Sequence, residues 1–287
     1  MQALLFDRLL LLAAAVLFST GGAAIKATHL TGWQVASFRS GAGALALLAL
    51  SREARQGWSR RALPVALAYA ATLVLFVLAN KLTTAANAIF LQDAAPIYLV
   101  LLGPLLLGEK ARRNELVLLA VVAAGIVMFF VAQETPVQTA PDPLRGNVLA
   151  MIAGWTWALT IAGLRWLGRD HGPAVANAPV LGNLLAFGAC LGMALPVSYL
   201  GWRDAAVIAY LGVVQIGLAY VCMTRALKRV RALEASLLLL VEPALSPIWA
   251  WLVHGERPGR WSLAGGALIL GACLVYSYRR SEPSQAG

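Results

Sequence analysis

A 24-residue segment occurs twice in this chain, and the repetition constrains the fold more than any other feature. The first copy is Asn87–Lys110, and a shift of 147 residues without a gap brings it onto Glu234–Arg257. The shift aligns Pro96 with Pro243, and both copies end in Gly-Glu followed by a cation. Each copy is an apolar run with a proline near its middle. We therefore predict two halves with one plan, each containing a membrane helix that is irregular at its centre.

The composition is that of a membrane protein. Of the 287 residues, 60% are hydrophobic and 13% are charged, whereas soluble domains carry about 25% charged residues. Apolar runs of about 20 residues, the length that crosses a bilayer core, follow one another from Arg8 to Tyr278. The formal net charge of +10 could indicate nucleic acid binding, but the basic residues lie in short connections between apolar runs. We therefore attribute the basic residues to membrane topology, and we predict neither a nucleic-acid partner nor a soluble domain.

Ten membrane spans are predicted, and the basic residues give their orientation. Of the 23 Lys and Arg, sixteen fall in connections on one side, six fall on the other, and Arg39 lies inside the second span. The richer side is expected to face the cytoplasm, together with both termini, in a bacterial-type inner membrane. The first run continues to Lys26 and is expected to be an uncleaved span rather than a signal peptide. The predicted spans are 8–26, 32–51, 62–80, 84–107, 114–133, 146–167, 174–199, 204–225, 232–253 and 260–279.

The predicted fold class is an all-α membrane protein with ten transmembrane helices in two inverted five-helix repeats. The first repeat is 1–133, and the second is 146–280. They are joined by an external linker at 134–145 that is rich in Pro and Thr, and a cytoplasmic tail follows at 281–287. Because five is an odd number, the second repeat must enter the membrane upside down. Such inverted repeats typically place the substrate near the midplane, between the repeats.

Three groups of residues carry a family resemblance. The strongest are the paired P…GE[KR] segments, Pro96–Lys110 and Pro243–Arg257. Arg225–Leu227 and Glu234–Ser236 lead into the second of these, and Ser19–Gly22 in the first span is a weaker element. On these residues the chain resembles the EamA-type branch of the drug/metabolite transporter superfamily, and within it the YddG-like exporters of aromatic amino acids and methyl viologen. The resemblance implies an exporter that works by alternating access, not an enzyme.

Three ionisable residues lie deep in the predicted spans, where charges are costly and usually functional. At ~1.5 Å per residue, Arg39 in the second span and Asp93 in the fourth reach similar depths. We therefore expect an intramembrane ion pair that neutralises both charges and holds the two spans together. Glu242 in the ninth span has no cation at its depth. It is a candidate for proton coupling or for binding a substrate ammonium, or it could brace the break at Pro243 as a protonated or hydrogen-bonded group.

The two aligned prolines are candidate hinges. A proline inside a helix removes one backbone hydrogen bond, and protein or water must satisfy the carbonyl that is set free. Recurrence of Pro96 and Pro243 under one shift favours a hinge role in alternating access. A simple packing kink is the alternative.

Further polar and aromatic residues inside the spans could line a central site. Trp155 and Trp157 lie together in the sixth span, but residues two apart do not share a helix face, so Trp157 is chosen as the one that faces substrate. Each residue taken singly is explained as well by packing or an interhelical hydrogen bond, yet an apolar wall with a few polar groups suits an amphipathic amino acid. The candidate cavity residues are Phe76, Asn80, Asn87, Gln92, Tyr98, Trp157, Gln215, Tyr220 and Glu242.

The predicted function is export of small organic solutes, above all aromatic and other amino acids, with aromatic cations such as methyl viologen as a further class. A sugar-phosphate or nucleotide-sugar antiporter is the alternative, but it would need several cations to bind phosphate, and Arg39 is the only one deep in a span. A membrane enzyme or scaffold is the rival from another class. The histidines His29, His171 and His254 lie in loops or at span ends, and the three cysteines lack metal-ligand spacing. We therefore expect no metal or cofactor, only the solute and the lipid bilayer as partners, and a carrier that could act as a monomer.

Overall fold

The computed structural model describes residues 2–56, 58–94, 98, 113–131, 136–169, 174–226, 230 and 238–281. In these ranges the regular structure is helical, apart from one isolated β-bridge between Val137 and Ala140. Five helical segments are long and apolar enough, by length and composition, to cross a membrane. The prediction of an all-helical membrane protein is confirmed, while the count of ten spans stays a prediction. The five segments are Leu5–Lys26, Ala62–Leu82, Pro143–Leu164, Val175–Ala194 and Trp202–Ala226.

The described helices follow the predicted spans, with two interruptions that were not predicted. The first span is divided at Thr20, and the eighth contains a π-helical stretch, η2. In the first half the elements are α1 (Gln2–Ser19), α2 (Gly21–Lys26), α3 (Gly32–Leu50), a 3-10 turn η1 (Glu53–Arg55), α4 (Ala62–Leu82), α5 (Ala85–Gln92) and α7 (Arg113–Val131). In the second half they are α8 (Pro143–Arg169), α9 (Ala174–Ala194), α10 (Trp202–Ala209), η2 (Tyr210–Leu218), α11 (Ala219–Ala226), α13 (Val241–His254) and α14 (Arg260–Ser281).

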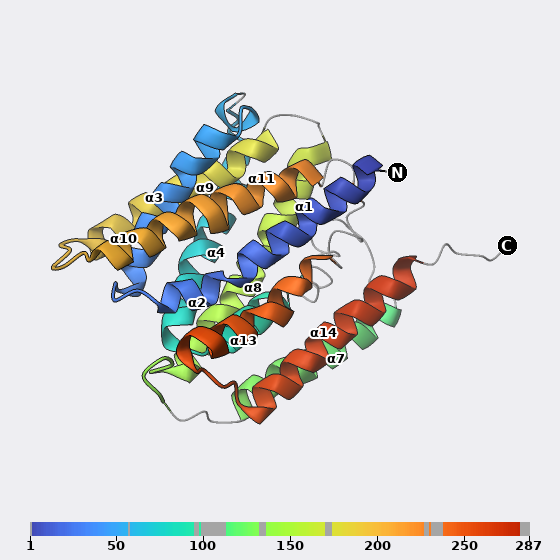
Figure 1. Cartoon of the computed structure of the whole chain (residues 1–287). Helices are drawn as coiled ribbons and strands as arrows, with labels where there is room; N and C mark the ends of the chain where they lie inside the picture. Colours follow the sequence, from blue (N-terminus) through green and yellow to red (C-terminus); the bar gives the residue numbers. More distant parts are fainter. Residues whose placement is uncertain are drawn as a thin grey trace.

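Helices of one half pack mainly on helices of the other (Figure 1). The α4 helix packs on α8 and α9, α3 packs on α9 and η2, and α1 packs on α11 and α13. The α7 and α14 helices lie side by side at one edge of the bundle. The 147-residue shift relates these pairings to one another. It places α4 on the eighth span and α8 on the first span, so the packing of α4 on α8 corresponds to the packing of α11 on α1. The packing therefore has the same twofold pattern as the sequence.

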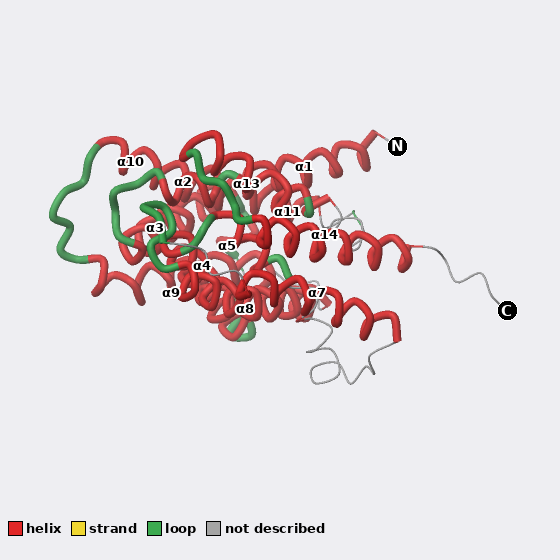
Figure 2. The backbone as a smooth tube through the Cα atoms, turned by 90° about the horizontal axis from the view of Figure 1, so that it is seen from below, coloured by secondary structure: helices red, strands yellow, loops and turns green. Residues whose placement is uncertain are grey.

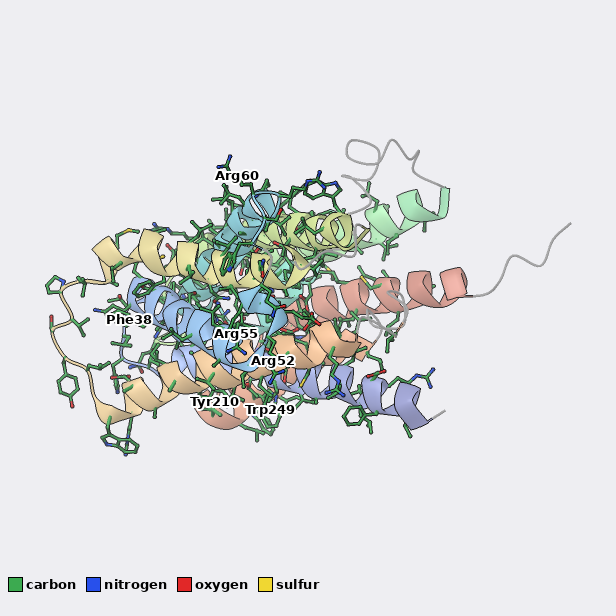
Figure 3. The ribbon with its side chains drawn as sticks, turned by 90° about the horizontal axis from the view of Figure 1, so that it is seen from above. Phe38, Arg52, Arg55, Arg60, Tyr210 and Trp249 are labelled. Atoms are coloured by element: carbon green, nitrogen blue, oxygen red, sulfur yellow. The ribbon has the colours of Figure 1, made fainter. Side chains whose placement is uncertain are left out.

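Several connections gather at one end of the bundle, opposite the end where α1 begins and α14 ends (Figure 2). We call it the loop end and define it by residues 27–31, 83–84, 136–142, 195–201 and 255–259. Hydrogen bonds tie these connections to the ends of other helices, for example from the Asp142 amide to the Leu82 carbonyl of α4 and from the His29 amide to Asp204 of α10. The connection between α3 and α4 lies outside this group and carries the exposed arginines Arg52, Arg55 and Arg60 (Figure 3).

Candidate functional site

The two copies of the repeated segment break at equivalent positions. The α5 helix ends at Gln92, and Asp93 follows it with turn geometry. In the second copy Leu240, the residue that the shift aligns with Asp93, forms a turn immediately before α13 begins. Pro243 is the third residue of α13, where its missing N–H has no intrahelical partner to lose. The break therefore precedes the proline instead of bending a helix around it, and Pro96 lies outside the described residues.

Two acidic side chains from different halves lie at or next to these breaks and influence each other electrostatically. Asp93 and Glu242 are both half-buried, and their carboxyl groups are near enough to interact electrostatically. Gln92, which is buried, lies beside the carboxyl of Asp93. The sequence gave Glu242 no cation at its depth, and the structure gives it an acidic neighbour. Two carboxyl groups that repel each other when both are ionised offer a place for a proton or for the cationic group of a ligand.

Tyr220 connects this acidic pair to Arg39. It lies buried on α11 and packs edge-on against Tyr69 of α4, with ring centroids 5.4 Å apart, and against Phe18 of α1 at 5.3 Å. Its hydroxyl interacts electrostatically with Glu242 and with Arg39. Tyr69 was not among the predicted residues, because a tyrosine in an apolar run gives no signal of its own that separates it from a packing residue.

Arg39 does not form the predicted ion pair with Asp93. The side chain is 2% exposed, and its Nη2 donates to the backbone carbonyl of Leu73 at 3.1 Å. Within the described ranges no carboxylate lies at ion-pair distance from the guanidinium. Equal depth fixes only the position along the bundle axis, whereas α3 packs on α9 and η2, and α5 packs on α8 and α13. The two charges therefore lie at similar predicted depths but against different neighbours.

Polar groups of other elements converge on the break in the first span. Thr20 Oγ1 and the Tyr210 hydroxyl of η2 share a hydrogen bond at 2.7 Å. The indole Nε1 of Trp249 in α13 donates to Ser19 Oγ at 2.9 Å. The sequence marked Ser19–Gly22 as a weak family element but gave it no contacts. In the structure it joins α1 and α2 to two elements of the second half.

Asn80 and Gln215 lie against the two glycines that follow this break. A Cβ added to Gly22 would lie 2.9 Å from Asn80 Oδ1, and one added to Gly21 would lie 2.9 Å from Gln215 Nε2. Both amide side chains are buried, and their oxygen atoms have no hydrogen-bond partner within the described part of the chain. The glycines thus allow two predicted polar residues to approach the backbone of the broken span.

Four other predicted cavity residues make contacts that do not involve the two carboxyl groups. Asn87 hydrogen-bonds at the loop end, to side chains of the α4–α5 connection and of α8. Tyr98 stacks on Trp155, with ring centroids 4.6 Å apart, and Phe76 is buried among apolar residues. Trp157 is half-buried and packs against two groups of apolar residues, one containing Phe76 and the other containing Tyr220. The structure brings Gln92, Tyr220 and Glu242 together and leaves the roles of the others as predictions.

A buried ion pair closes the loop end, and sequence reasoning missed it. Lys26 Nζ lies 3.0 Å from Glu256 Oε2, and the two side chains are 3% and 2% exposed. Lys26 also donates to the carbonyls of Thr83 and Thr139, and Glu256 Oε1 accepts from the Ala85 amide. These contacts join α2, the start of α5, the α7–α8 connection and the α13–α14 connection. The partners are far apart in the sequence, so the pair becomes visible only in the folded chain.

Comparison with known proteins also divides the chain into two halves. A model of the EamA-like transporter family matches residues 7–131 and 144–278. Two curated proteins named pseudopaline exporter CntI, from two strains of Pseudomonas aeruginosa, are 26% and 28% identical to this chain, with 94% of it and 95% of each relative covered. An uncharacterized transporter from Archaeoglobus fulgidus is 24% identical, with 71% of each chain covered. One crystal structure shares the fold, with a TM-score of 0.64, 20% identity, and 96% of this chain and 99% of that chain covered.

These relatives do not specifically support the predicted branch. The sequence was read as YddG-like, whereas both relatives whose names state a substrate are pseudopaline exporters. The family match and the exporter relatives together indicate a transporter rather than an enzyme.

Proposed function

Because the chain belongs to the EamA-like transporter family, we propose that it exports small organic solutes across a bacterial-type inner membrane. The match of the family model to both halves carries the proposal. Ten spans in two inverted repeats, 1–133 and 146–280, with both termini in the cytoplasm, complete the proposed architecture. In that orientation the loop end faces outward, and the Lys26–Glu256 pair closes the external side.

Export then proceeds by alternating access around the two breaks. Solute enters from the cytoplasmic side and meets the acidic pair, Asp93 and Glu242, beside Tyr220. Release requires the loop end to open, with the helices swinging at the breaks at Asp93 and Leu240, each three residues before a proposed hinge proline, Pro96 or Pro243. A solute drives this exchange only through its different affinity for the two states.

The proposed solutes are aromatic and other amino acids. Support comes from the carboxyl groups at the breaks, which suit an ammonium group, and from Trp157 and Tyr220, whose rings suit an apolar side chain. A second candidate is pseudopaline or a solute related to it. The two relatives that carry this name, aligned with 94% of this chain, favour it.

Uptake into proteoliposomes tests both candidates. The purified full-length protein should accumulate labelled phenylalanine or tryptophan. Trp157→Ala should reduce this uptake about tenfold, because losing a buried aromatic contact costs on the order of 1.5 kcal/mol. Trp261→Ala, which removes an exposed tryptophan, is the matched control. Failure to transport any amino acid would refute the amino-acid proposal. Competition by pseudopaline, with no competition by amino acids, would favour the second candidate.

A further inference from the structure

Arg39 holds a buried positive charge that the described part of the chain leaves uncompensated. Its Nη2 donates to the Leu73 carbonyl, and its Nε has no hydrogen-bond partner in the described ranges. The titratable groups that interact with it electrostatically are the hydroxyls of Tyr69 and Tyr220, which are uncharged when protonated. Ionised groups buried in a membrane protein are normally paired or bound to a ligand. The guanidinium of Arg39 therefore has no anionic partner within the described ranges.

The surroundings of Arg39 offer a second donor for such an anion. The Tyr69 hydroxyl is buried beside the polar side chains of Tyr220 and Asn183, and no contact in the described ranges has the full geometry of a hydrogen bond to it. Guanidinium groups and hydroxyls both donate to carboxylate oxygens, and the guanidinium does so with a fixed fork geometry. Asn183 of α9 lies beside Tyr69 and closes the same region from a third helix. The α3, α4 and α9 helices pack on one another, which positions these side chains.

A carboxyl group also interacts with the Tyr220 hydroxyl. Tyr220 interacts with Arg39 and also with Glu242, whose carboxyl has Asp93 as its neighbour. A solute bound beside Tyr220 would thus have both the guanidinium and the carboxyl groups as neighbours. A single guanidinium matches a singly charged carboxylate, whereas a phosphate dianion would require more than one cation.

We propose that Arg39 binds the carboxylate of the exported solute, with the Tyr69 hydroxyl as the second donor. The inference rests on the proposed export function and defines its substrate class as carboxylate-bearing solutes. It also gives Arg39 a role in binding rather than in pairing with Asp93.

Thermal stabilisation of the purified full-length protein measures binding without requiring transport. The probes are phenylalanine, phenylalaninamide, which lacks the carboxylate, and 3-phenylpropanoate, which lacks the ammonium, together with benzoate and succinate. Ligands that bind only the folded protein raise its melting temperature with concentration. Wild-type protein should bind phenylalanine roughly 30-fold or more tightly than phenylalaninamide, because the amide leaves the buried charge of Arg39 unpaired.

The Arg39→Gln variant should lose this preference and bind the acid and the amide equally. Arg39→Lys keeps the charge but loses the forked pair of donors, so its ratio of phenylalanine to phenylalaninamide affinity should be intermediate. This variant also allows the test if Arg39→Gln fails to fold. Lys81→Gln removes a cation at the loop end, where Lys81 donates to Thr28, and should leave the ratio unchanged. A merely structural role for Arg39 would lower stability without changing the ratio.

Each outcome bears on one proposal. Equal binding of phenylalanine and phenylalaninamide by the wild type would overturn the inference, as would a panel in which no carboxylate stabilises the protein. Stabilisation by carboxylates that requires Arg39, found together with no amino-acid transport, would refute the amino-acid proposal and support the inference.

Discussion

Removing the charge of Glu256 tests whether the loop-end ion pair holds that end closed. Lys26 Nζ and Glu256 Oε2 are 3.0 Å apart, with both side chains at most 3% exposed. Removing one partner of a buried pair costs about 3–5 kcal/mol, because the other charge stays buried and unpaired. Glu256→Gln keeps an oxygen that can accept the Ala85 amide hydrogen bond, so we expect the lower end of that range. A change of ~3 kcal/mol shifts a closed–open equilibrium roughly 100-fold.

The Lys26→Met and Glu256→Gln double variant completes the argument. It removes both charges together, so neither is left buried without a partner. The combined cost should therefore be smaller than the sum of the two single costs, by about 1 kcal/mol or more. Additive effects would mean that the two side chains act independently.

Cysteine labelling reads out the equilibrium. Ser246 of α13 is buried, and it lies about 12 Å from the end of its helix at ~1.5 Å per residue. In a background without the three native cysteines, Ser246→Cys should react slowly with an impermeant maleimide added outside intact cells. Glu256→Gln should raise the labelling rate roughly 100-fold if the pair contributes ~3 kcal/mol. Arg203→Met, which removes an exposed cation at the same end, should not change the rate. An unchanged rate in Glu256→Gln would refute the closure argument.

Other substitutions probe the breaks themselves. Gly22→Ala places a methyl group 2.9 Å from Asn80 Oδ1, so the melting temperature should fall, corresponding to about 1–3 kcal/mol; Gly188→Ala, which meets nothing within 4 Å, is the control and should not change it. Glu242→Gln should abolish the dependence of proteoliposome transport on a pH gradient, and transport that needs no gradient and survives the substitution would end the proton-coupling hypothesis. Pro243→Ala should slow transport several-fold without lowering the melting temperature, because a first-turn proline gives up no helical hydrogen bond. Unchanged transport would contradict the hinge role.

The sequence predicted those parts of the fold that depend on local chain properties. The α3, α4 and α14 helices begin at residues 32, 62 and 260, where the second, third and tenth spans were predicted to begin. Apolar length and flanking polar residues determine such boundaries, so they can be read without tertiary structure. The break at Thr20 was not predicted, because glycines such as Gly21 and Gly22 occur both inside helices and at helix interruptions.

The site was harder to predict because it depends on which helices are neighbours. The depth of Arg39 and Asp93 can be counted along the chain, but their lateral positions follow from the packing of α3 and α5 on different partners. The Lys26–Glu256 pair joins the two halves at the loop end in the same way. Sequence periodicity carries no information on such contacts between distant segments.

The acidic pair shows how a duplicated scaffold acquires an asymmetric site. The shift pairs Asp93 with Leu240, so only one copy carries an acid at this position. Glu242 adds the second acid from the other copy, and packing across the halves brings the two breaks together. The shift also pairs Arg39 with Ala186 and Tyr220 with Leu73, which leaves the cation and the central hydroxyl on one side only. In the proposed carrier, two equivalent breaks therefore supply a symmetric motion, and single departures from the repeat supply both a cation and carboxyl groups, which suit a carboxylate-bearing solute with an ammonium group.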